Sequence, residues 1–254
     1  MQIRIVTLEE TSKLVSKMKY IFPDADVGIQ RGIDVRDSPT ELLFQSNLIT
    51  HSVVHTLQHG RRWDHEVPTK GAIGLAQANR LAMEEDFSQP LLLLEADCKI
   101  RNAPKLKKEV DQLLIHADKF DMAVFGGWFQ GKKFMKTEPW LPKGFKVIKD
   151  KFWGLQCVLY TPKGRRKVGK LLNKPLEMQI DSLYGAEARM GNLTVVGQVK
   201  NWSTTQSLHV STVQSPIPFL LRDHHKVGIL LSICALVLYL VSCKNKASHR
   251  YLYR

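Results

Sequence analysis

A run of four leucines that leads into two acidic residues constrains the fold more than any other stretch. Residues 91–94 are all leucine, Pro90 precedes them, and Glu95, Ala96 and Asp97 follow. An apolar run without polar alternation is typical of a strand that is buried on both faces of a parallel sheet. In open α/β sheets, ligands bind beyond the carboxyl ends of such strands. The pattern therefore predicts an α/β fold with its functional edge at the end of this strand.

The two acids at this edge predict a metal site. Glu95 and Asp97 lie on the same side of an extended segment, because side chains repeat every second residue. Their oxygens are suited to hold Mn²⁺ or Mg²⁺ against a phosphorylated ligand. We predict Asp97 as the main metal ligand and Glu95 as the second, also in contact with the phosphorylated ligand. The alternative interpretation is that both acids merely end a buried strand.

The first part of the chain predicts a strand, a helix and a second strand. These are residues 3–8, 9–22 and 27–35. This order within so short a segment is typical of the start of an α/β sheet. Asp34 lies near the end of the second predicted strand, where it is expected to face the ribose or base of a nucleotide. A solvated loop carboxylate is the alternative.

Two helices are predicted next, at residues 41–59 and 71–83. The second is rich in small residues, so its backbone can approach a ligand closely, and Gly71 at its start is predicted to do so. Lys70 and Arg80 are predicted to hold phosphates, with a solvated surface role as the alternative.

The second half of the chain continues the α/β pattern. Residues 103–116 predict an amphipathic helix, 122–127 and 153–160 predict strands, and 161–172 predict a basic helix. Trp128 follows a glycine pair and offers a flat apolar face on which a sugar ring can stack. A place in the core is the alternative for this tryptophan.

Asp181 is the candidate general base. It lies between apolar residues in the segment 178–184, where burial disfavours the ionised form and raises the pKa of a carboxyl toward neutrality. Glu187 is the reserve candidate. Asp181 is alternatively the N-cap of a helix at 182–190.

Charge and cysteine spacing exclude some functions. The 37 lysines and arginines against 24 acids give a net charge of +13, which is compatible with nucleic acid, a membrane surface or phosphorylated ligands. The sequence has no arginine-rich helix and no zinc-finger spacing, and it contains no CxxC pair. We therefore expect no nucleic-acid partner.

An uncharged apolar segment near the carboxyl end predicts attachment to a membrane. Residues 227–243 contain no charge and lie between Lys226 and Lys244. The length and uniform apolarity indicate a transmembrane or membrane-inserted helix. We expect a membrane-associated protein with a cytosolic catalytic domain, although the basic tail would itself favour the cytosolic side, so the topology stays open. The predicted parts are a catalytic domain (1–215), a linker (216–226), this helix and a basic tail (244–254).

Several stretches, taken in order, resemble the family 25 glycosyltransferases of the lipooligosaccharide galactosyltransferase type. The matching stretches are Gly32–Asp34, Gly71–Asn79, Leu94–Asp97, Leu159–Gly164 and Ile180–Asp181. The chain departs from the family pattern at two positions. Asn79 stands where the family has a histidine, and Ala96 stands where it has the middle acid of three.

The resemblance implies a GT-A-like nucleotide-sugar-binding domain with a central, mostly parallel sheet. It implies a glycosyltransferase that moves a sugar from a nucleotide-sugar donor to a hydroxyl of a glycan, a lipid-linked or a protein acceptor, with inversion and with Mn²⁺ or Mg²⁺. Asn79 would then belong to the donor site. The two departures suggest an alternative, a catalytically inactive, membrane-anchored binding protein of the same fold.

Overall fold

A computed structural model describes residues 1–131, 135–200 and 202–206. The chain divides into two units, Met1–Gln214 and Ser215–Arg254, and all described residues belong to the first. The predicted linker (216–226), membrane helix (227–243) and basic tail (244–254) lie outside the described residues. Within the described part, no helix is long and apolar enough to cross a membrane.

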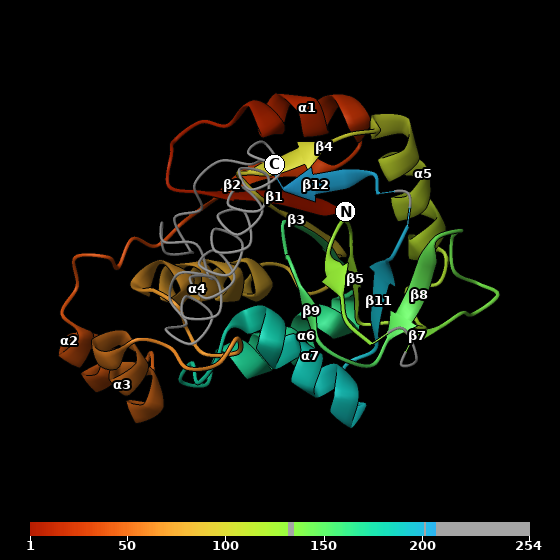
Figure 1. The fold of residues 1–254 in the computed structure, drawn as a ribbon. Helices are drawn as coiled ribbons and strands as arrows, with labels where there is room; N and C mark the ends of the chain where they lie inside the picture. The colour runs from red at the N-terminus through yellow and green to blue at the C-terminus, as the bar shows by residue number, and fades with distance from the viewer. Residues whose placement is uncertain (132–134, 201, 207–254) are drawn as a thin grey trace, which may run out of the picture. The chain divides into compact units, whose positions relative to one another are not determined.

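An eight-stranded sheet forms the centre of the described part (Figure 1). β1 runs parallel to both β2 and β3, whereas β10 and β8 run against their neighbours, so the other six strands share one direction. The prediction of an α/β fold with a mostly parallel sheet is confirmed in this sense. In spatial order the strands are β2 (Asp26–Arg31), β1 (Gln2–Thr7), β3 (Leu91–Glu95), β10 (Cys157–Tyr160), β5 (Met122–Val124), β11 (Val195–Gln198), β8 (Phe145–Ile148) and β7 (Met135–Lys136).

Two short antiparallel pairs lie apart from this sheet in the hydrogen-bonding pattern. β4 (Cys98–Ile100) pairs with β12 (Thr204–Gln206), and β6 (Trp128–Phe129) pairs with β9 (Phe152–Trp153). β4 comes directly after the acidic turn that follows β3, so the first pair joins that turn to the last described residues.

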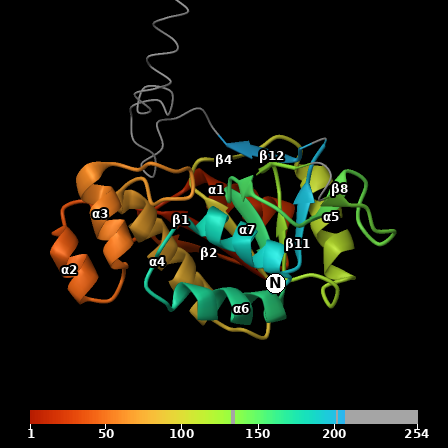
Figure 2. The same ribbon diagram turned by 60° about the horizontal axis from the view of Figure 1, so that its bottom comes forward.

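Helices cover both faces of the sheet (Figures 1 and 2). One apolar cluster contains buried residues of α1 (Lys13–Ile21) and α5 (Ala103–Leu114). The other contains buried residues of α4 (Lys70–Glu84), α6 (Pro162–Leu172) and α7 (Ile180–Met190). Two further helices, α2 (Thr40–Gln45) and α3 (His51–His59), pack beside α4 and contribute to the second cluster.

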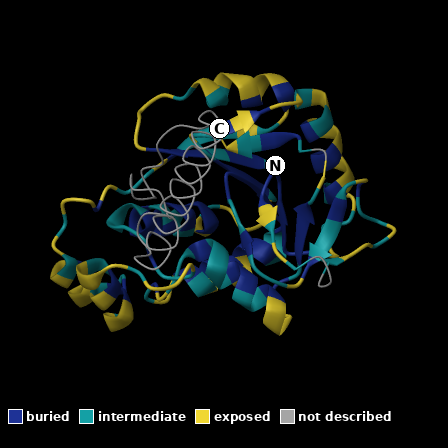
Figure 3. Ribbon diagram, viewed as in Figure 1, coloured by how far each residue is buried: buried dark blue, intermediate teal, exposed yellow. Residues whose placement is uncertain are grey.

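The leucine run shows why the sheet needs cover on both faces. Leu91 and Leu93 point into the cluster with α4, whereas Leu92 and Leu94 point into the cluster with α1. All four side chains are buried, as are most residues of the central strands (Figure 3). Successive side chains of a strand point to opposite faces, so a strand between two helical layers has to be apolar at every position.

Two predicted elements are each divided into two in the structure, and the strand predicted at 27–35 ends at Arg31, so Asp34 lies in the loop that follows it. The helix predicted at 41–59 is two helices, and Asn47 between them has a positive φ of 57°, a conformation that asparagine tolerates better than most residues. The strand predicted at 153–160 is likewise two strands, β9 and β10. Gly154, with a φ of 91°, breaks the extended backbone between them.

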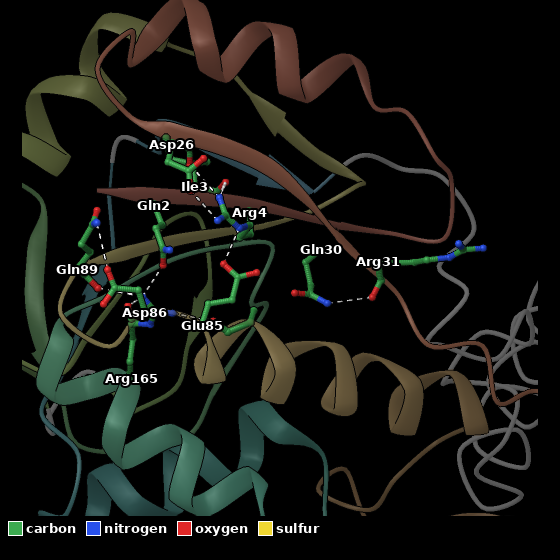
Figure 4. Close-up of polar contacts among 11 residues, drawn as sticks. Gln2, Ile3, Arg4, Asp26, Gln30, Arg31, Glu85, Asp86, Gln89 and Arg165 are labelled. Atoms are coloured by element: carbon green, nitrogen blue, oxygen red, sulfur yellow. Dashed lines mark hydrogen bonds and ion pairs between the residues drawn. The ribbon is translucent and has the colours of Figure 1, made fainter.

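A buried arginine joins α6 to β1, to the end of α4 and to the turn before β3. Arg165 of α6 is fully buried, and its guanidinium donates to Gln2 Oε1 at 2.7 Å and to the carbonyl oxygens of Ala82 at 2.9 Å and Gln89 at 3.0 Å (Figure 4). It also donates to the carbonyl oxygen of Asp86. These acceptors belong to the start of β1, the last turn of α4 and the turn that enters β3. Burial lowers the pKa of the guanidinium, so these bonds are what keep the cation in place.

Replacing this arginine should destabilise the fold strongly. Arg165→Met leaves several buried acceptors without a donor, so we expect the free energy of unfolding to fall by roughly 3–5 kcal/mol. Urea denaturation followed by circular dichroism measures the loss. The neighbouring Arg166 is exposed, and Arg166→Met should change stability by less than about 0.5 kcal/mol. Equal stability of the two variants would contradict the role given to Arg165.

Candidate functional site

A cavity of about 290 Å³ opens at the carboxyl ends of β1, β2 and β3. The first half of α4 closes it, with Gly71, Gly74 and Leu75 on its wall. Its polar lining consists of Thr7, Glu9, Asp34, Arg36, Glu95 and Asp97. The volume is near the lower end of the range for small-molecule sites.

The topology of the sheet places the cavity here. From β1 the chain first builds β2 on one side and later β3 on the other, so the connections diverge at the carboxyl end of β1. Such switch points leave a crevice in α/β sheets. α4 comes close to this edge because Gly74 has no side chain, and a Cβ atom there would meet the carbonyl oxygen of Ile33 at 2.0 Å.

Asp97 presents an oxygen for which the described residues supply no hydrogen-bond partner. Its Oδ2 accepts a hydrogen bond from Gln206 Nε2 at 2.7 Å, which fixes the carboxylate against β12. Its Oδ1 is buried and, among the described residues, has no donor. A buried carboxylate oxygen is costly without a partner, so this atom is suited to accept one from a ligand.

Glu95 is held beside Asp97 at the end of β3. Its backbone N–H donates to the carbonyl oxygen of Gln156 at 3.0 Å, which keeps the residue within the sheet. Burial, and then the charges of Asp97 and Asp181, raise the pKa of its carboxyl to about 8. At neutral pH, and without a cation beside it, Glu95 therefore holds a proton.

The fold brings Asp181, which is distant in sequence, near enough to Glu95 for its charge to act on that carboxyl. Asp181 lies in the first turn of α7, where its Oδ1 accepts from the backbone N–H of Ser182 at 2.7 Å. The backbone N–H of Gly154 donates to it as well. Burial raises the pKa of this carboxyl to about 6, although these hydrogen bonds favour the ionised form. The N-cap of α7 is Gln179, so the alternative of Asp181 as the N-cap is wrong.

On the opposite wall, Asp34 pairs with a residue that sequence reasoning missed. Arg36 Nε donates to Asp34 Oδ1 at 2.8 Å, and the guanidinium also pairs with Oδ2. The arginine holds the pKa of Asp34 at about 2. An acid and a base two residues apart after a strand are the only sequence signal for this pair.

The remaining predicted residues on α4 divide into two groups. Gly71 lines the cavity. Lys70 instead donates from Nζ to the carbonyl oxygen of Ser38 at 2.6 Å, so it braces the loop that follows β2. Asn79 is 3% exposed and donates to the carbonyl oxygen of Leu75, whereas Arg80 reaches Asn173 at 3.4 Å. Of these three side chains, none is among the described residues that line the cavity.

Two further candidates lie outside the cavity lining in the described part. Glu187 is nearly two turns further along α7 than Asp181, and its Oε2 accepts from Asn192 Nδ2 at 2.8 Å in the turn that ends the helix. Trp128 opens β6 and is 69% exposed, so the alternative of a core position for it is wrong. Of the predicted residues, Asp34, Gly71, Glu95 and Asp97 therefore line the cavity. Asp181 is not among the described lining residues, but its charge acts on the carboxyl of Glu95.

The acidic edge fits a divalent cation that a substrate helps to bind. Mg²⁺ is commonly held by one or two carboxylates together with water and substrate phosphates. Asp97, with its buried unpartnered oxygen, and Glu95, with its raised pKa, supply two such carboxylates. Within the described residues, no group of three His, Cys, Asp or Glu side chains is placed to hold a metal without further ligands.

Comparison with known proteins leaves the function to be argued from this geometry. No protein-family model matches the chain, and no curated protein matches it. Among solved structures, apo UDP-glucose pyrophosphorylase is similar with a TM-score of 0.42 at 12% identity, over 82% of this chain and 92% of that one. An active-site mutant of LgtC is similar with a TM-score of 0.38 at 10% identity, over 90% and 95%. The inositol-1-phosphate CTP transferase from T. maritima is similar with a TM-score of 0.39 at 12% identity, over 85% of this chain and 91% of that one.

The raised pKa of Glu95 predicts how stability depends on pH. In the folded state Glu95 keeps its proton up to a pKa of about 8, whereas the unfolded chain loses it near the ordinary value of 4.5. Folding therefore takes up a proton, and the stability falls as the pH rises toward 8. Glu95→Gln should remove this loss, which we expect to be on the order of 1–2 kcal/mol between pH 6.5 and 8.5.

Urea denaturation in the presence of EDTA, at the two pH values, measures this difference. The window lies above the pKa of Asp181, so that group contributes little to it. Glu9→Gln is the control because Glu9 is an exposed acid of the same cavity. An unchanged pH dependence in Glu95→Gln would contradict the protonated state assigned to Glu95.

Proposed function

We propose that the protein is a nucleotide-sugar-dependent glycosyltransferase that transfers the sugar to a hydroxyl acceptor. The convergence of Glu95, Asp97 and Asp181 beside a cavity at the switch point of the sheet carries this proposal. Burial raises the pKa of the Glu95 and Asp181 carboxyls and so costs free energy on folding, and their retention near Asp97 is best explained by a ligand that uses them. The order of motifs that resembles family 25 supports the same reaction, and inversion remains a prediction from that resemblance alone.

The cavity is the proposed donor site. Thr7, Glu9 and Asp34 offer hydrogen-bonding groups to the hydroxyls of a ribose or to the edge of a base. Arg36 adds a cation on the same wall, and the start of α4 brings the backbone of Gly71 within reach of the ligand. The diphosphate would then lie toward Glu95 and Asp97.

Asp97, with Glu95 beside it, would hold Mn²⁺ or Mg²⁺ on the donor side. When bound, such a cation offsets the charge that builds on the departing diphosphate. Glu95 has to release its proton when the cation binds, because ligating carboxylates are ionised. Asp97 stays anchored through its other oxygen, which Gln206 holds.

Asp181 is the proposed general base. The acceptor oxygen forms a bond to the anomeric carbon, and its proton passes to Asp181, while the bond from that carbon to the diphosphate breaks and the diphosphate leaves with the electron pair. A pKa of about 6 suits this task, since the carboxylate is ionised at neutral pH and still basic enough to take a proton. The bonds from Ser182 and Gly154 orient the side chain.

The donor site is tested by thermal shift with a panel of nucleotide sugars, with and without Mn²⁺. A ligand at a hundredfold excess over its Kd should raise the Tm of the wild type by about 5–10 °C in the presence of the metal. Asp97→Asn should abolish the metal-dependent part of the shift. Asp111→Asn, an exposed site on α5, is the matched control and should behave like the wild type.

The same panel separates binding from chemistry. Asp181→Asn should keep the thermal shift and lower the turnover of the donor by about 10²–10⁴-fold, because only the proton acceptor is lost. Turnover is followed by release of the nucleoside diphosphate. If the wild type shows neither a metal-dependent shift nor turnover, the proposal is wrong.

An inactive binding protein is the second candidate. Ala96, exposed between the two acids, stands where the resembling family has a further acid. A wild type that shows the metal-dependent shift but no turnover with any donor or saccharide acceptor would favour this candidate.

Attachment to a membrane through 227–243, with the catalytic domain in the cytosol, remains a prediction. A charge at the centre of a membrane helix costs about 2.5–3.5 kcal/mol, so Leu236→Arg should shift the protein from the membrane to the supernatant fraction. Sedimentation of cell extracts measures this. Equal distribution of variant and wild type would contradict the prediction.

A further inference from the structure

Three tryptophans from three separate segments lie close together at the β6 and β9 pair. Trp128 and Trp153 face each other as directly opposite residues of the β6 and β9 pair. Trp202, from the segment before β12, lies with its ring centroid 6.2 Å from that of Trp128. Directly opposite residues in an antiparallel pair place their side chains on the same face. We call Trp128, Trp153 and Trp202 the tryptophan platform.

The platform belongs to the surface and not to the core. On the other face of the same pair, Phe129 and Phe152 pack toward the interior with ring centroids 6.1 Å apart. Trp128 by contrast is 69% exposed, and Trp153 and Trp202 are partly exposed. A large aromatic surface held open to water on an ordered element is typical of a binding surface.

The platform is held rigidly. Gly126, two residues before Trp128, has a φ of 69°, and a Cβ atom there would come within 2.4 Å of the carbonyl oxygen of Thr204. The backbone that carries Trp202 therefore packs directly against the backbone that leads into Trp128. Ser203 adds bonds from its N–H and hydroxyl to Gln198 Oε1.

Backbone connections join the platform to two of the three acids. Gly154, the neighbour of Trp153, donates its N–H to Asp181. Gln206, four residues after Trp202, donates to Asp97 Oδ2. The cavity is lined by residues at the ends of β1, β2 and β3 and by the start of α4, and none of the three tryptophans is among the described residues that line it.

We propose that the tryptophan platform is the acceptor subsite and that it binds a pyranose ring of a saccharide acceptor. This inference rests on the proposed function, because Asp181 is the proposed base and the acceptor hydroxyl has to reach it. A pyranose has one face of C–H groups and a rim of hydroxyls, so it matches an aromatic plane flanked by polar groups.

One atom of the platform favours a polar ligand over an apolar protein surface. The Trp202 indole N–H is buried and has no acceptor among the described residues. A buried tryptophan N–H usually has a partner, and a sugar hydroxyl beside the ring supplies one. Asp181, next to the platform, would in turn receive the proton of the reacting hydroxyl.

Transfer to methyl glycosides of glucose, galactose and mannose tests the subsite. Hydrolysis of the donor by water, measured without a glycoside through release of the nucleoside diphosphate, is the internal reference. Trp128→Ala should lower kcat/KM for transfer to the best glycoside by about tenfold or more, while hydrolysis of the donor stays within about twofold. Trp202→Phe keeps an aromatic ring but removes the N–H together with the second ring of the indole, and it should lower transfer about three- to tenfold. Trp63→Ala, at a tryptophan that is 64% exposed elsewhere, should leave both rates unchanged.

The outcomes separate this inference from the proposed function. If the donor is turned over but neither Trp128→Ala nor Trp202→Phe affects transfer, or if no glycoside is used, the subsite is wrong and the transferase survives. If the wild type does not turn over any donor, saturation-transfer NMR with the same glycosides decides. Binding that is lost in Trp128→Ala supports a saccharide platform, and absence of binding overturns it. A wild type that is dimeric while Trp128→Ala is monomeric also overturns it.

Discussion

The guanidinium of Arg165 is the contact on which the geometry of the cavity depends. A buried cation that is satisfied mainly by carbonyl oxygens tolerates little displacement of those oxygens, because each lost bond leaves charge uncompensated. Its acceptors are the end of α4, the turn that enters β3 and the first residue of β1. The cavity lies between these same three elements at their opposite ends. The bonds of Arg165 at the end of α4 thus fix the position of this helix relative to Glu95 and Asp97, which lie at its other end.

The acidic edge works against this stability. Glu95 carries a pKa of about 8 and Asp181 one of about 6, and in both cases burial is the largest cause. Groups that keep such pKa values cost free energy in the absence of a ligand, and a functional site is a common reason for that cost. The buried arginine and the doubly covered leucine strand compensate for it. The contacts that stabilise the fold therefore lie at the start of β3, and the proposed functional residues lie at its end.

Sequence reasoning identified what is local and missed what depends on the tertiary fold. The leucine run predicts β3 and its acidic end correctly because burial on both faces leaves a direct mark on composition. Asn47 and Gly154 interrupt predicted elements through backbone conformations that periodicity does not report. Arg165 was missed because it belongs to a basic helix, in which every cation has the pattern of a solvated one. No spacing rule indicates that Asp181 lies beside Glu95, since that proximity arises only when α7 packs on the sheet.

The two sides of the acidic edge come from different parts of the chain. The described residues that line the cavity all precede Cys98, whereas the tryptophan platform and Asp181 come from residues after Gly127. Substitutions on the later side can therefore alter the surface next to Asp181 without touching the walls of the cavity. In evolutionary terms, and on the proposed function, such a division would allow descendants of this fold to change the molecule they modify while they continue to draw on the same activated precursor.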